Sequence, residues 1–589
     1  MKNNLGVLEI DNFYLSRIYE EGIEEEKKKS NGVYYTPKVI VRYIMKKTLE
    51  KHDILKNPCP KILDISCGCG NFLLEAYDIL YDLIESKIYD LRDKYNDEYW
   101  CIDNIHKHIV ENCIFGVDID NKALEILKNA LSNKNSSEKE DKTKYSVNIY
   151  CEDGLKKEWD FKFDYIVGNP PYVGHKSLDK DYKKYLLKEY NSVYRDKSDL
   201  YFCFYKRVID LINKDGTISM ITPRYFLESP SGVNLRKYIK ENSYIEEIVD
   251  FLGANIFKNI GIAGCIVTLK PIKYKDFKED HSINIYKIKD ENIKINEVED
   301  LSSFINGGSF ENFYINQNLL EEDWLITNPQ DREFYKKIQC KCKYELDEIA
   351  TSFQGIITGC DKAFIIEDDN EISVPKNLLK VWVKNKNIRK YIIDDTKYRL
   401  IYSNDIDDEK IYENTIKKYI EPYRVKLENR RECKKNIRKW YELQWGREKY
   451  LFEQEKIMYP YKSKCNRFAI DHNNSYCSAD VYSFFIKEKY KNEFSSEYLV
   501  GVLNSDIYNK YFKIIAKCMG KDIYDYYPNK VMKIKIFKDN NYKKIEELSK
   551  KIIFILKNKN TKYSEDELEI KLSILEEEIN KLIKESLQI

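Results

Sequence analysis

The sequence predicts an α/β fold with a doubly wound sheet, and three observations support this prediction. Short apolar runs typical of buried strands cover residues 61–64, 113–118, 147–151 and 163–168. Helical patterns lie between these runs, which gives the alternation βαβαβ. Polar residues mark the end of each predicted strand, and open α/β sheets bind their ligands at this edge. The four strand ends therefore predict a single binding site.

The turn after the first strand combines an acid with glycines. Asp64 ends the strand, and Gly68 and Gly70 allow the backbone to come close to a ligand. The six-residue dinucleotide fingerprint is absent, because Asn-Phe-Leu follows the Gly-x-Gly pair. A pyrophosphate site is therefore disfavoured. The pattern fits a cofactor without phosphates, whose amino and carboxylate groups meet Asp64 and backbone amides.

The second and third strands also end at acids. Asp118 stands where an acid commonly accepts hydrogen bonds from both ribose hydroxyls. Asp153 follows the third strand and can accept a hydrogen bond from an adenine amino group. Both positions predict contacts to the nucleoside part of the same cofactor.

The fourth strand ends at Asn-Pro-Pro-Tyr, residues 169–172. Two prolines cannot continue a strand ladder, so the chain makes a stiff corner there. The Asn169 side-chain oxygen and a fixed carbonyl can accept both hydrogens of a planar amino group, and the Tyr172 ring can stack on a flat heterocycle. The alternative is a proline-rich turn after a core strand. The tetrapeptide alone leaves both interpretations open, and the three upstream strand ends favour the site.

Composition limits the class of protein. With 589 residues the chain is too long for one core, and 43% hydrophobic residues indicate globular domains. No apolar run is long enough to span a bilayer, so we expect a cytoplasmic protein without a membrane partner. The 15 cysteines and 6 histidines form no spaced ligand set, which predicts reduced thiols and no metal.

The first residues of the chain are a polar arm, residues 1–30. After it, Thr36 and Pro37 precede a periodic apolar run, residues 39–45, which predicts a helix start with a capping hydroxyl.

The order of these motifs carries a resemblance to a known family. Tyr-Tyr-Thr-Pro at 34–37, Asp-x-x-x-Gly-x-Gly at 64–70, Val-Asp-Ile-Asp at 117–120, Glu-Asp-Gly at 152–154 and Asn-Pro-Pro-Tyr at 169–172 together resemble the gamma-class, TaqI-like N6-adenine DNA methyltransferases. Segments 199–204, 221–226 and 251–257 are similar to later motifs of that group. The resemblance implies a Rossmann-like sheet that uses S-adenosylmethionine, followed by a mixed α+β target-recognition domain.

The resemblance also implies roles for individual residues. The residues expected to hold S-adenosylmethionine are Tyr35, Thr36, Pro37, Asp64, Ser66, Cys67, Gly68, Gly70, Asp118, Ile119 and Asp153. The catalytic residues would be Asn169, Pro170 and Tyr172, acting on an adenine flipped out of the duplex. Phe257 would pack against that base.

Four parts of the chain are expected. They are an arm at 1–30, a methyltransferase domain at 31–325, a target-recognition domain at 326–540 and a helical segment at 541–589, where Leu and Ile recur at helical spacing. The first domain boundary follows from Gly-, Asn- and Pro-containing turns between 305 and 329. Residues 353–364 and 498–505 resemble signatures of the family's target-recognition domain.

A basic stretch with interleaved aromatic residues covers 424–467, with fourteen Lys and Arg against six Asp and Glu. This composition suits double-stranded DNA, although a solvated helix face is the alternative for any single lysine. The residues expected to contact DNA are Arg430, Arg431, Arg438, Lys439, Gln444, Trp445 and Arg447. The turn at 444–447 carries groups able to read adenine or guanine edges.

Similarity to clostridial orphan adenine methyltransferases implies an adenine-rich, asymmetric target such as CAAAAA, read by a nucleoid-associated monomer. About thirty residues precede the first motif, too few for a fused nuclease, so an orphan enzyme is favoured. Two alternatives stay open. One is a methyltransferase for RNA or for a release-factor glutamine, and the other is a non-catalytic DNA-specificity protein.

Overall fold

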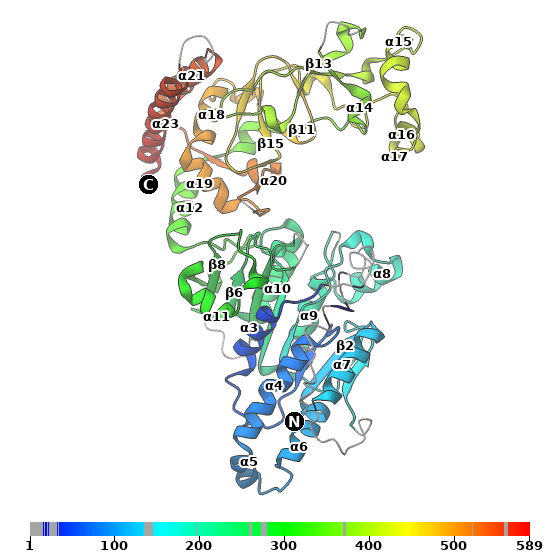
Figure 1. Ribbon diagram of the computed structural model, residues 1–589. Helices are drawn as coiled ribbons and strands as arrows, with labels where there is room; N and C mark the ends of the chain where they lie inside the picture. Colours follow the sequence, from blue (N-terminus) through cyan, green and yellow to red (C-terminus); the bar gives the residue numbers. More distant parts are fainter. Residues whose placement is uncertain are drawn as a thin grey trace, which may run out of the picture. The chain divides into compact units, whose positions relative to one another are not determined.

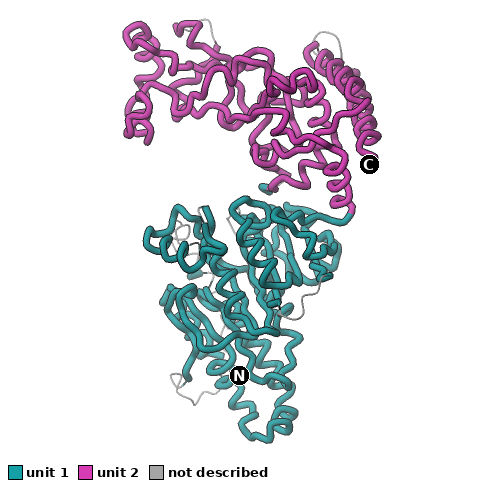
Figure 2. The backbone as a smooth tube through the Cα atoms, turned by 180° about the vertical axis from the view of Figure 1, so that it is seen from behind, with its two compact units in different colours: residues 1–329, 519–521 teal, residues 330–518, 522–589 magenta. Residues whose placement is uncertain are grey.

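The chain folds into two compact units. In a computed structural model the described residues are 16, 18, 19, 22, 32, 34–134, 145–195, 197–257, 262–272, 280–368, 373–520, 522–558 and 564–589. Unit 1 comprises residues 1–329 with 519–521, and unit 2 comprises residues 330–518 with 522–589 (Figure 2). The expected arm at 1–30 lies almost wholly outside the described residues, and residues 541–589 fall within unit 2. No helix in the described parts has the length and apolar character needed to cross a membrane.

Unit 1 is built on a nine-stranded sheet in the order β3-β2-β1-β4-β5-β7-β6-β8-β9 (Figure 1). The strands are β1 (Ile62–Asp64), β2 (Ile114–Asp118), β3 (Asn148–Cys151), β4 (Phe163–Gly168), β5 (Ile212–Pro223), β6 (Ser243–Asp250), β7 (Gly264–Pro271), β8 (Ser282–Ile288) and β9 (Phe310–Asn316). Strands β3, β2, β1, β4 and β5 pair in parallel, and β7 runs antiparallel between β5 and β6. The predicted α/β class is confirmed.

The parallel pairing brings the four predicted strand ends to one edge. Ile62 pairs with Ile114 of β2 and with Tyr165 of β4, and Asp118 pairs with Cys151 of β3. Asp153, Asp118, Asp64 and Asn169 therefore follow four neighbouring strands in spatial order. Residues that are up to 105 positions apart in the sequence meet because parallel strands share the direction of their carboxyl ends.

Helices connect and cover these strands. In unit 1 they are α3 (Lys38–Leu49), α4 (Asn71–Ser86), α5 (Ile88–Tyr95), α6 (Ile102–His108), α7 (Asn121–Asn133), α8 (Lys180–Glu189), α9 (Tyr201–Leu211), α10 (Val233–Asn242) and α11 (Leu301–Phe304). Gly70 caps α4 with φ 82°, a left-handed conformation that favours glycine. An added Cβ there would also lie 2.1 Å from Leu127 Cδ1.

The start of α3 differs from the sequence prediction. Its N-cap is Pro37, and no side chain caps it. The Thr36 hydroxyl, expected to cap this helix, instead accepts a hydrogen bond from Asn169 Nδ2 at 3.0 Å. The capping assignment was wrong because a long-range partner, invisible in the local sequence, takes the hydroxyl.

Unit 2 combines small sheets with helices, as expected for a mixed α+β domain. One four-stranded sheet has the order β11-β19-β15-β17 and the other β12-β14-β13-β18. The strands are β10 (Tyr344–Glu345), β11 (Ala350–Gln354), β12 (Ile365–Glu367), β13 (Leu379–Val383), β14 (Tyr398–Ile401), β15 (Lys456–Pro460), β16 (Lys462–Ser463), β17 (Ala469–Asp471), β18 (Tyr476–Cys477), β19 (Val481–Ile486), β20 (Tyr524–Asp525) and β21 (Lys535–Ile536).

The helices of unit 2 include a long C-terminal pair. They are α12 (Pro329–Lys341), which spans the division, α13 (Leu346–Ile349), α14 (Asp361–Phe364), α15 (Glu413–Thr415), α16 (Arg424–Glu428), α17 (Arg431–Lys434), α18 (Ser496–Asn504), α19 (Asp506–Ile515), α20 (Pro528–Val531), α21 (Tyr542–Lys557) and α23 (Glu565–Leu587). Helices α21 and α23 pack together, which confirms the helical pattern predicted at the C-terminal end.

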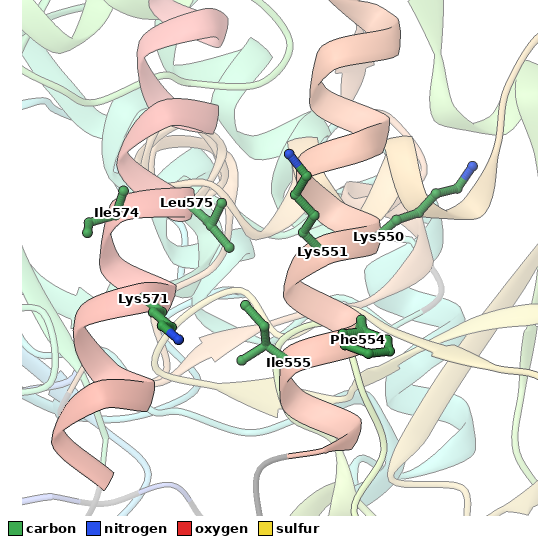
Figure 3. Close-up of a pocket in the computed structure, with 7 residues that line it drawn as sticks. All are labelled: Lys550, Lys551, Phe554, Ile555, Lys571, Ile574 and Leu575. Carbon is green, nitrogen blue, oxygen red and sulfur yellow. The ribbon is translucent and has the colours of Figure 1, made fainter. Parts of the chain in front are cut away.

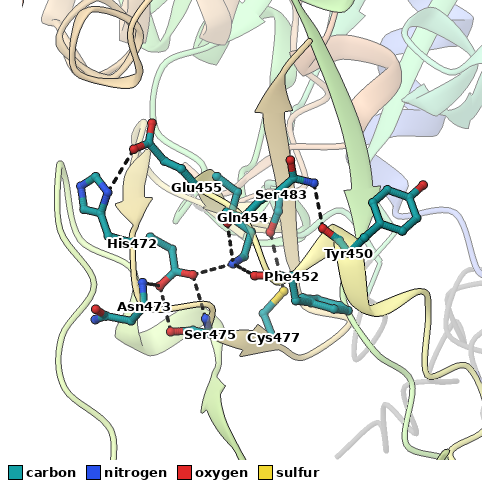
Figure 4. A network of polar contacts seen from close by, with 11 residues as sticks. Tyr450, Phe452, Gln454, Glu455, His472, Asn473, Ser475, Cys477 and Ser483 are labelled. Carbon is teal, nitrogen blue, oxygen red and sulfur yellow. Dashed lines mark hydrogen bonds and ion pairs between the residues drawn. The ribbon is translucent and has the colours of Figure 1, made fainter. Parts of the chain in front are cut away.

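A buried ion pair anchors the β15–β17 corner of unit 2 (Figure 4). Lys456 Nζ lies 2.5 Å from Asp471 Oδ2, and the two side chains are 0% and 2% exposed. Lys456 also donates to the Phe452 carbonyl, while Asp471 accepts from the Ser475 amide and hydroxyl at 2.8 Å each. Each buried charge is therefore surrounded by partners, which is the condition for tolerating such a pair.

Asp471→Asn should destabilise unit 2 by about 3–5 kcal/mol, because it leaves the buried Lys456 ammonium without its counter-charge. Urea unfolding of the full chain, followed by tryptophan fluorescence, measures this change. Glu367→Gln is the matched control. Its partner Lys397 lies 2.8 Å away on the surface, with side chains 64% and 52% exposed, so its unfolding curve should stay at the wild-type position. Equal effects of the two variants would contradict this account of the pair.

Candidate functional site

A cavity of about 510 Å³ opens at the carboxyl ends of β1 to β4. Asp64, Asp118, Asp153 and Asn169 all line it, as do Thr36 and the turn from Ser66 to Cys69. This volume is in the range of sites for small ligands and cofactors. The four sequence motifs therefore contribute to one hollow in unit 1.

The Asn169 side chain is held in one orientation. Its Nδ2 group donates to the Tyr34 carbonyl at 3.1 Å and to Thr36 Oγ1 at 3.0 Å. Because both amide hydrogens have acceptors, Oδ1 is left as the outward acceptor, and the assignment of oxygen and nitrogen follows from this network. The Tyr172 hydroxyl donates to this Oδ1 atom. The residue after the strand is thus an oriented hydrogen-bond acceptor on a rigid support.

Three aromatic rings surround the Asn169 acceptor. Tyr172 lies 5.4 Å from Tyr34 and 6.0 Å from Phe257, measured between ring centroids. Tyr34 and Phe257 are 6.1 Å apart, which closes the triangle. Tyr172 and Phe257 are buried, whereas Tyr34 is half-buried and lines the cavity. Tyr34 is the ring of this cluster that lines the cavity, where a flat ring can pack against it.

Two carboxyl groups of the cavity, Asp64 and Asp118, have raised pKa values. Burial raises the pKa of Asp64 to about 8, and the nearby Asp118 adds to this rise. Burial also raises the pKa of Asp118, although the Asp120 and Gly68 amides donate to it and oppose the change. Among the described residues that line the cavity, Lys156 is the one cation. The site is therefore suited to a ligand that brings positive charge.

Asp153 and Ile119 add a polar and an apolar group to the lining of the cavity. Asp153 accepts from the Leu155 amide at 3.0 Å and from the Tyr182 hydroxyl at 3.0 Å. Ile119 also lines the cavity and is 72% exposed, so its side chain is open to a ligand in the cavity.

The structure places the sequence-predicted residues in two groups. Nine line the cavity: Thr36, Asp64, Ser66, Cys67, Gly68, Asp118, Ile119, Asp153 and Asn169. Six are absent from its lining: Tyr35, Pro37, Gly70, Pro170, Tyr172 and Phe257. Pro37 and Gly70 are the N-caps of α3 and α4, which explains their position.

Sequence reasoning missed several lining residues, of which Tyr34 and Tyr182 are the most informative. Tyr34 stands beside Tyr35 in the same motif, so the motif itself was the available signal. Tyr182 lies on α8, and nothing in the local pattern marks it as a partner of Asp153. Only the packing of α8 against the strand ends reveals it.

The basic stretch of unit 2 contains one clear correction. Arg430 was expected to contact phosphate, but its guanidinium donates to four backbone carbonyls inside the unit. The acceptors belong to Leu427, Thr358, Trp440 and Glu442. Arg430 therefore holds neighbouring loops together, and four of its five N–H donors already have acceptors inside the unit.

The other basic-stretch residues divide by exposure. Arg431, Lys439 and Trp445 are exposed, whereas Arg438, Gln444 and Arg447 are half-buried. Gln444 donates to Glu432 at 3.0 Å, and Arg447 donates to Gln354 Oε1 at 3.1 Å. Lys439 donates to the Tyr441 hydroxyl at 2.7 Å. Arg431, Lys439 and Trp445 are therefore the members of this stretch whose side chains are accessible at the surface of unit 2.

A second hollow, of about 620 Å³, lies between α21 and α23 of unit 2 (Figure 3). It is lined by Lys550, Lys551 and Lys571 together with the apolar side chains of Phe554, Ile555, Ile574 and Leu575. This lining contains no carboxylate, thiol, imidazole or amide side chain. Its ionisable groups are three exposed lysines, with no acid or imidazole in the lining to activate them, so the cavity of unit 1 is the candidate active site.

Two parts of the chain match known families. Residues 112–257 match the Eco57I restriction-modification methylase, and residues 368–536 match the TaqI-like C-terminal specificity domain. The Type II restriction enzyme and methyltransferase RM.Eco57I of Escherichia coli is 26% identical over 311 residues, which cover 45% of this chain and only 30% of that longer enzyme. The Type II methyltransferase M.BstVI of Geobacillus stearothermophilus is 24% identical over 490 residues, or 78% of this chain and 82% of the relative.

A solved structure shares the fold of both units. The Type IIL restriction-modification enzyme MmeI, determined in complex with DNA, matches with a TM-score of 0.68 at 16% identity. The match covers 98% of this chain and 79% of MmeI. At this identity the likeness concerns the fold.

Asp64 makes the stability of the ligand-free protein depend on pH. Its pKa is higher in the folded state than in the unfolded state, so folding is favoured below pH 4 and loses this contribution as pH rises to about 8. Asp64→Asn removes the titration. Relative to wild type, the variant should therefore gain up to roughly 1.4 kcal/mol per pH unit across this window. Thermal unfolding at pH 5 and pH 8 measures the difference, with the exposed Asp93→Asn as control. Parallel pH profiles for wild type and Asp64→Asn would contradict the burial argument.

Proposed function

We propose that this chain, which its two matched segments relate to the TaqI-like Type II methyltransferases, is a site-specific DNA adenine-N6 methyltransferase that uses S-adenosylmethionine and flips its target base. The single observation that carries the proposal is the oriented Asn169 acceptor at the edge of an acidic cavity.

The Asn169 geometry suits the chemistry of an adenine amino group. The N6 lone pair is delocalised into the ring, so attack requires the nitrogen to become tetrahedral. Asn169 Oδ1 and the Pro170 carbonyl would accept its two hydrogens and stabilise the positive charge that develops. Because Tyr34 and Thr36 already hold the amide, no reorganisation is needed at the moment of reaction. A general base is not required before transfer, since the amino protons become far more acidic afterwards.

The residues of the cavity fit S-adenosylmethionine. Asp64 would receive its ammonium group, Asp118 its ribose hydroxyls and Asp153 its adenine amino group, while Ile119 would cover the adenine ring. When bound, the cofactor supplies an electrophilic methyl group on a sulfonium. An ammonium group beside Asp64 would oppose the rise in its pKa that burial and Asp118 cause, and would favour the charged carboxylate.

The Tyr172 hydroxyl uses one of the two lone pairs of Asn169 Oδ1, and the other can accept a hydrogen bond from the target amino group. A second acceptor is already within reach, since the Ile221 carbonyl lies 3.4 Å from this hydroxyl. Turning the O–H toward that carbonyl exchanges one hydrogen bond for another and costs little. The rings of Tyr172, Tyr34 and Phe257 would then hold the extruded base, and base–aromatic stacking is worth about 1–3 kcal/mol per contact.

Unit 2 is the proposed target-recognition unit. Its match to a specificity domain and the fold shared with MmeI, which was solved with DNA, support this role. Arg431, Lys439 and Trp445 are the exposed residues we assign to DNA contact, with Arg438, Gln444 and Arg447 behind them. The finer proposal is an orphan, monomeric, nucleoid-associated enzyme similar to the clostridial methyltransferase CamA, acting on an adenine-rich asymmetric site such as CAAAAA. The narrow minor groove of such a tract allows shape readout.

Methyl transfer tests the proposal directly. Wild type with radiolabelled S-adenosylmethionine should label duplexes that contain the target, and should not label RNA or a release factor. Asn169→Ala should lower the rate by about 10²–10³-fold, the loss typical for one preorganised charge-stabilising group, while cofactor affinity stays within a few-fold of wild type. Filter binding and calorimetry separate the two effects.

Tyr172→Phe is the matched control for Asn169→Ala, because it removes only a hydroxyl from the same network and keeps the ring. Its rate should stay within about tenfold of wild type, since the ring supplies the stacking. Wild-type turnover by Asn169→Ala would overturn the assignment of the catalytic acceptor. Label on RNA or on a release factor in place of DNA would overturn the substrate class.

The salt dependence of DNA affinity tests the basic stretch. Arg431→Gln and Lys439→Gln should each reduce the slope of log K against log salt concentration by about 0.9, the value for one lost phosphate contact. Arg430→Gln should lower the unfolding midpoint without changing the slope, because its guanidinium is held inside the unit. Lys551→Gln on α21 serves as a surface control. If neither Arg431→Gln nor Lys439→Gln changes the slope, this stretch is not part of the interface.

A further inference from the structure

Two thiols and an imidazole gather at the amino ends of β1 and β2. Cys59 precedes β1, His108 ends α6, and Cys113 ends the short turn of helix Ile109–Cys113 that leads into β2. Their ligand atoms all lie within 4.8 Å of one another. His108 and Cys113 are buried and Cys59 is half-buried. Among the described residues this is the one group of three potential metal ligands.

We propose that Cys59, His108 and Cys113 bind one thiophilic divalent cation of the zinc type. Thiolate and imidazole are the donors that such cations prefer, and three protein ligands leave a fourth position for water. In a tetrahedral site the donor atoms stand roughly 3.5–3.8 Å apart, given Zn–S and Zn–N bonds of about 2.3 and 2.0 Å. The observed group is therefore within about 1 Å of a closed site, and side-chain rotation alone can bring it together.

The surroundings of His108 match those of a metal-binding histidine. Nε2 lies 2.8 Å from the Pro58 carbonyl and Nδ1 lies 3.3 Å from the Tyr99 hydroxyl. Whichever nitrogen binds the cation, the other keeps a partner that fixes the ring, which is the arrangement found around metal-bound histidines. The Trp100 ring, 4.8 Å from the imidazole centroid, limits its movement further.

Hydrogen bonds also fix the loop that carries Cys59, the second of the three proposed ligands. The Cys59 amide donates to Asn57 Oδ1 at 3.1 Å, and Asn57 Nδ2 donates to Asp164 Oδ2 at 3.3 Å. The Cys59 thiol lies 3.5 Å from the Asn112 carbonyl, next to Cys113. The two sulfur atoms thus come from a loop before β1 and from the end of the helical turn before β2.

Sequence spacing could not reveal this group. The three residues are separated by 49 and 5 positions, which matches no short ligand motif, and the sequence therefore predicted no metal. Parallel pairing of β1 with β2 brings them together, at the end of the strands opposite to the cavity that holds Asp64 and Asp118. The proposed metal site is therefore separate from the candidate active site.

Metal titration of the reduced full-length chain tests the proposal. Co²⁺ should bind at one ion per chain and produce the near-ultraviolet absorption of cobalt–thiolate bonds, and Zn²⁺ should displace it. Cys59→Ser and Cys113→Ser should each weaken binding by at least about 100-fold, since even outer-shell changes cost 10–100-fold. Cys101→Ser, a half-buried cysteine at the start of α6, should bind like wild type.

Thermal unfolding supplies a second readout. Zn²⁺ should raise the unfolding midpoint of wild type and of Cys101→Ser, and should leave that of Cys59→Ser unchanged. Cys59 is half-buried, so its serine variant is expected to fold and keeps the test meaningful. Uptake of less than about one ion per chain by wild type, or equal affinity in Cys59→Ser and wild type, would overturn the proposal.

Discussion

The orientation of one side-chain amide is the constraint on which the rest of the site depends. Asn169 follows a buried strand and is locked by two acceptors from a segment more than 130 residues earlier, the Tyr34 carbonyl and the Thr36 hydroxyl. An amide free to flip would present a donor as often as an acceptor, and a donor would repel an amino group. Tyr34 and Thr36, in the segment before α3, therefore determine that Asn169 presents its oxygen as an acceptor, although neither residue carries a charge.

The same logic explains the acidity of the cavity. Parallel pairing brings Asp64 and Asp118 close together, with Asp64 buried and Asp118 half-buried, which is costly in the absence of a cation. Such strain at a strand edge is retained where a ligand relieves it. The backbone amides of Ser66 and Gly68 donate to these carboxylates and oppose the rise in their pKa. The acidic pair therefore suits a ligand that brings positive charge.

The sequence predicted the four strand ends, because short apolar runs that end at polar residues report local structure directly. It failed where a side chain's partner is remote. Thr36 satisfies a local capping rule yet binds Asn169, and Arg430 belongs to a basic stretch yet donates to four carbonyls. Tyr182 and Cys59 follow no motif at all. In each case tertiary packing, which no window of sequence contains, decided the role.

Strands β1 and β2 join the proposed metal site at their amino ends to the cavity at their carboxyl ends. β1 is only three residues long, and its neighbour β2 pairs with it along that whole length. Fixing Cys59 against Cys113 at the amino ends would therefore fix the starting points of the two strands whose last residues are Asp64 and Asp118. Short strands transmit such a constraint because few dihedral angles lie between the ends. A cation bound at the amino ends of these strands would thus limit how far Asp64 and Asp118 can move apart, although none of its three ligands lines the cavity.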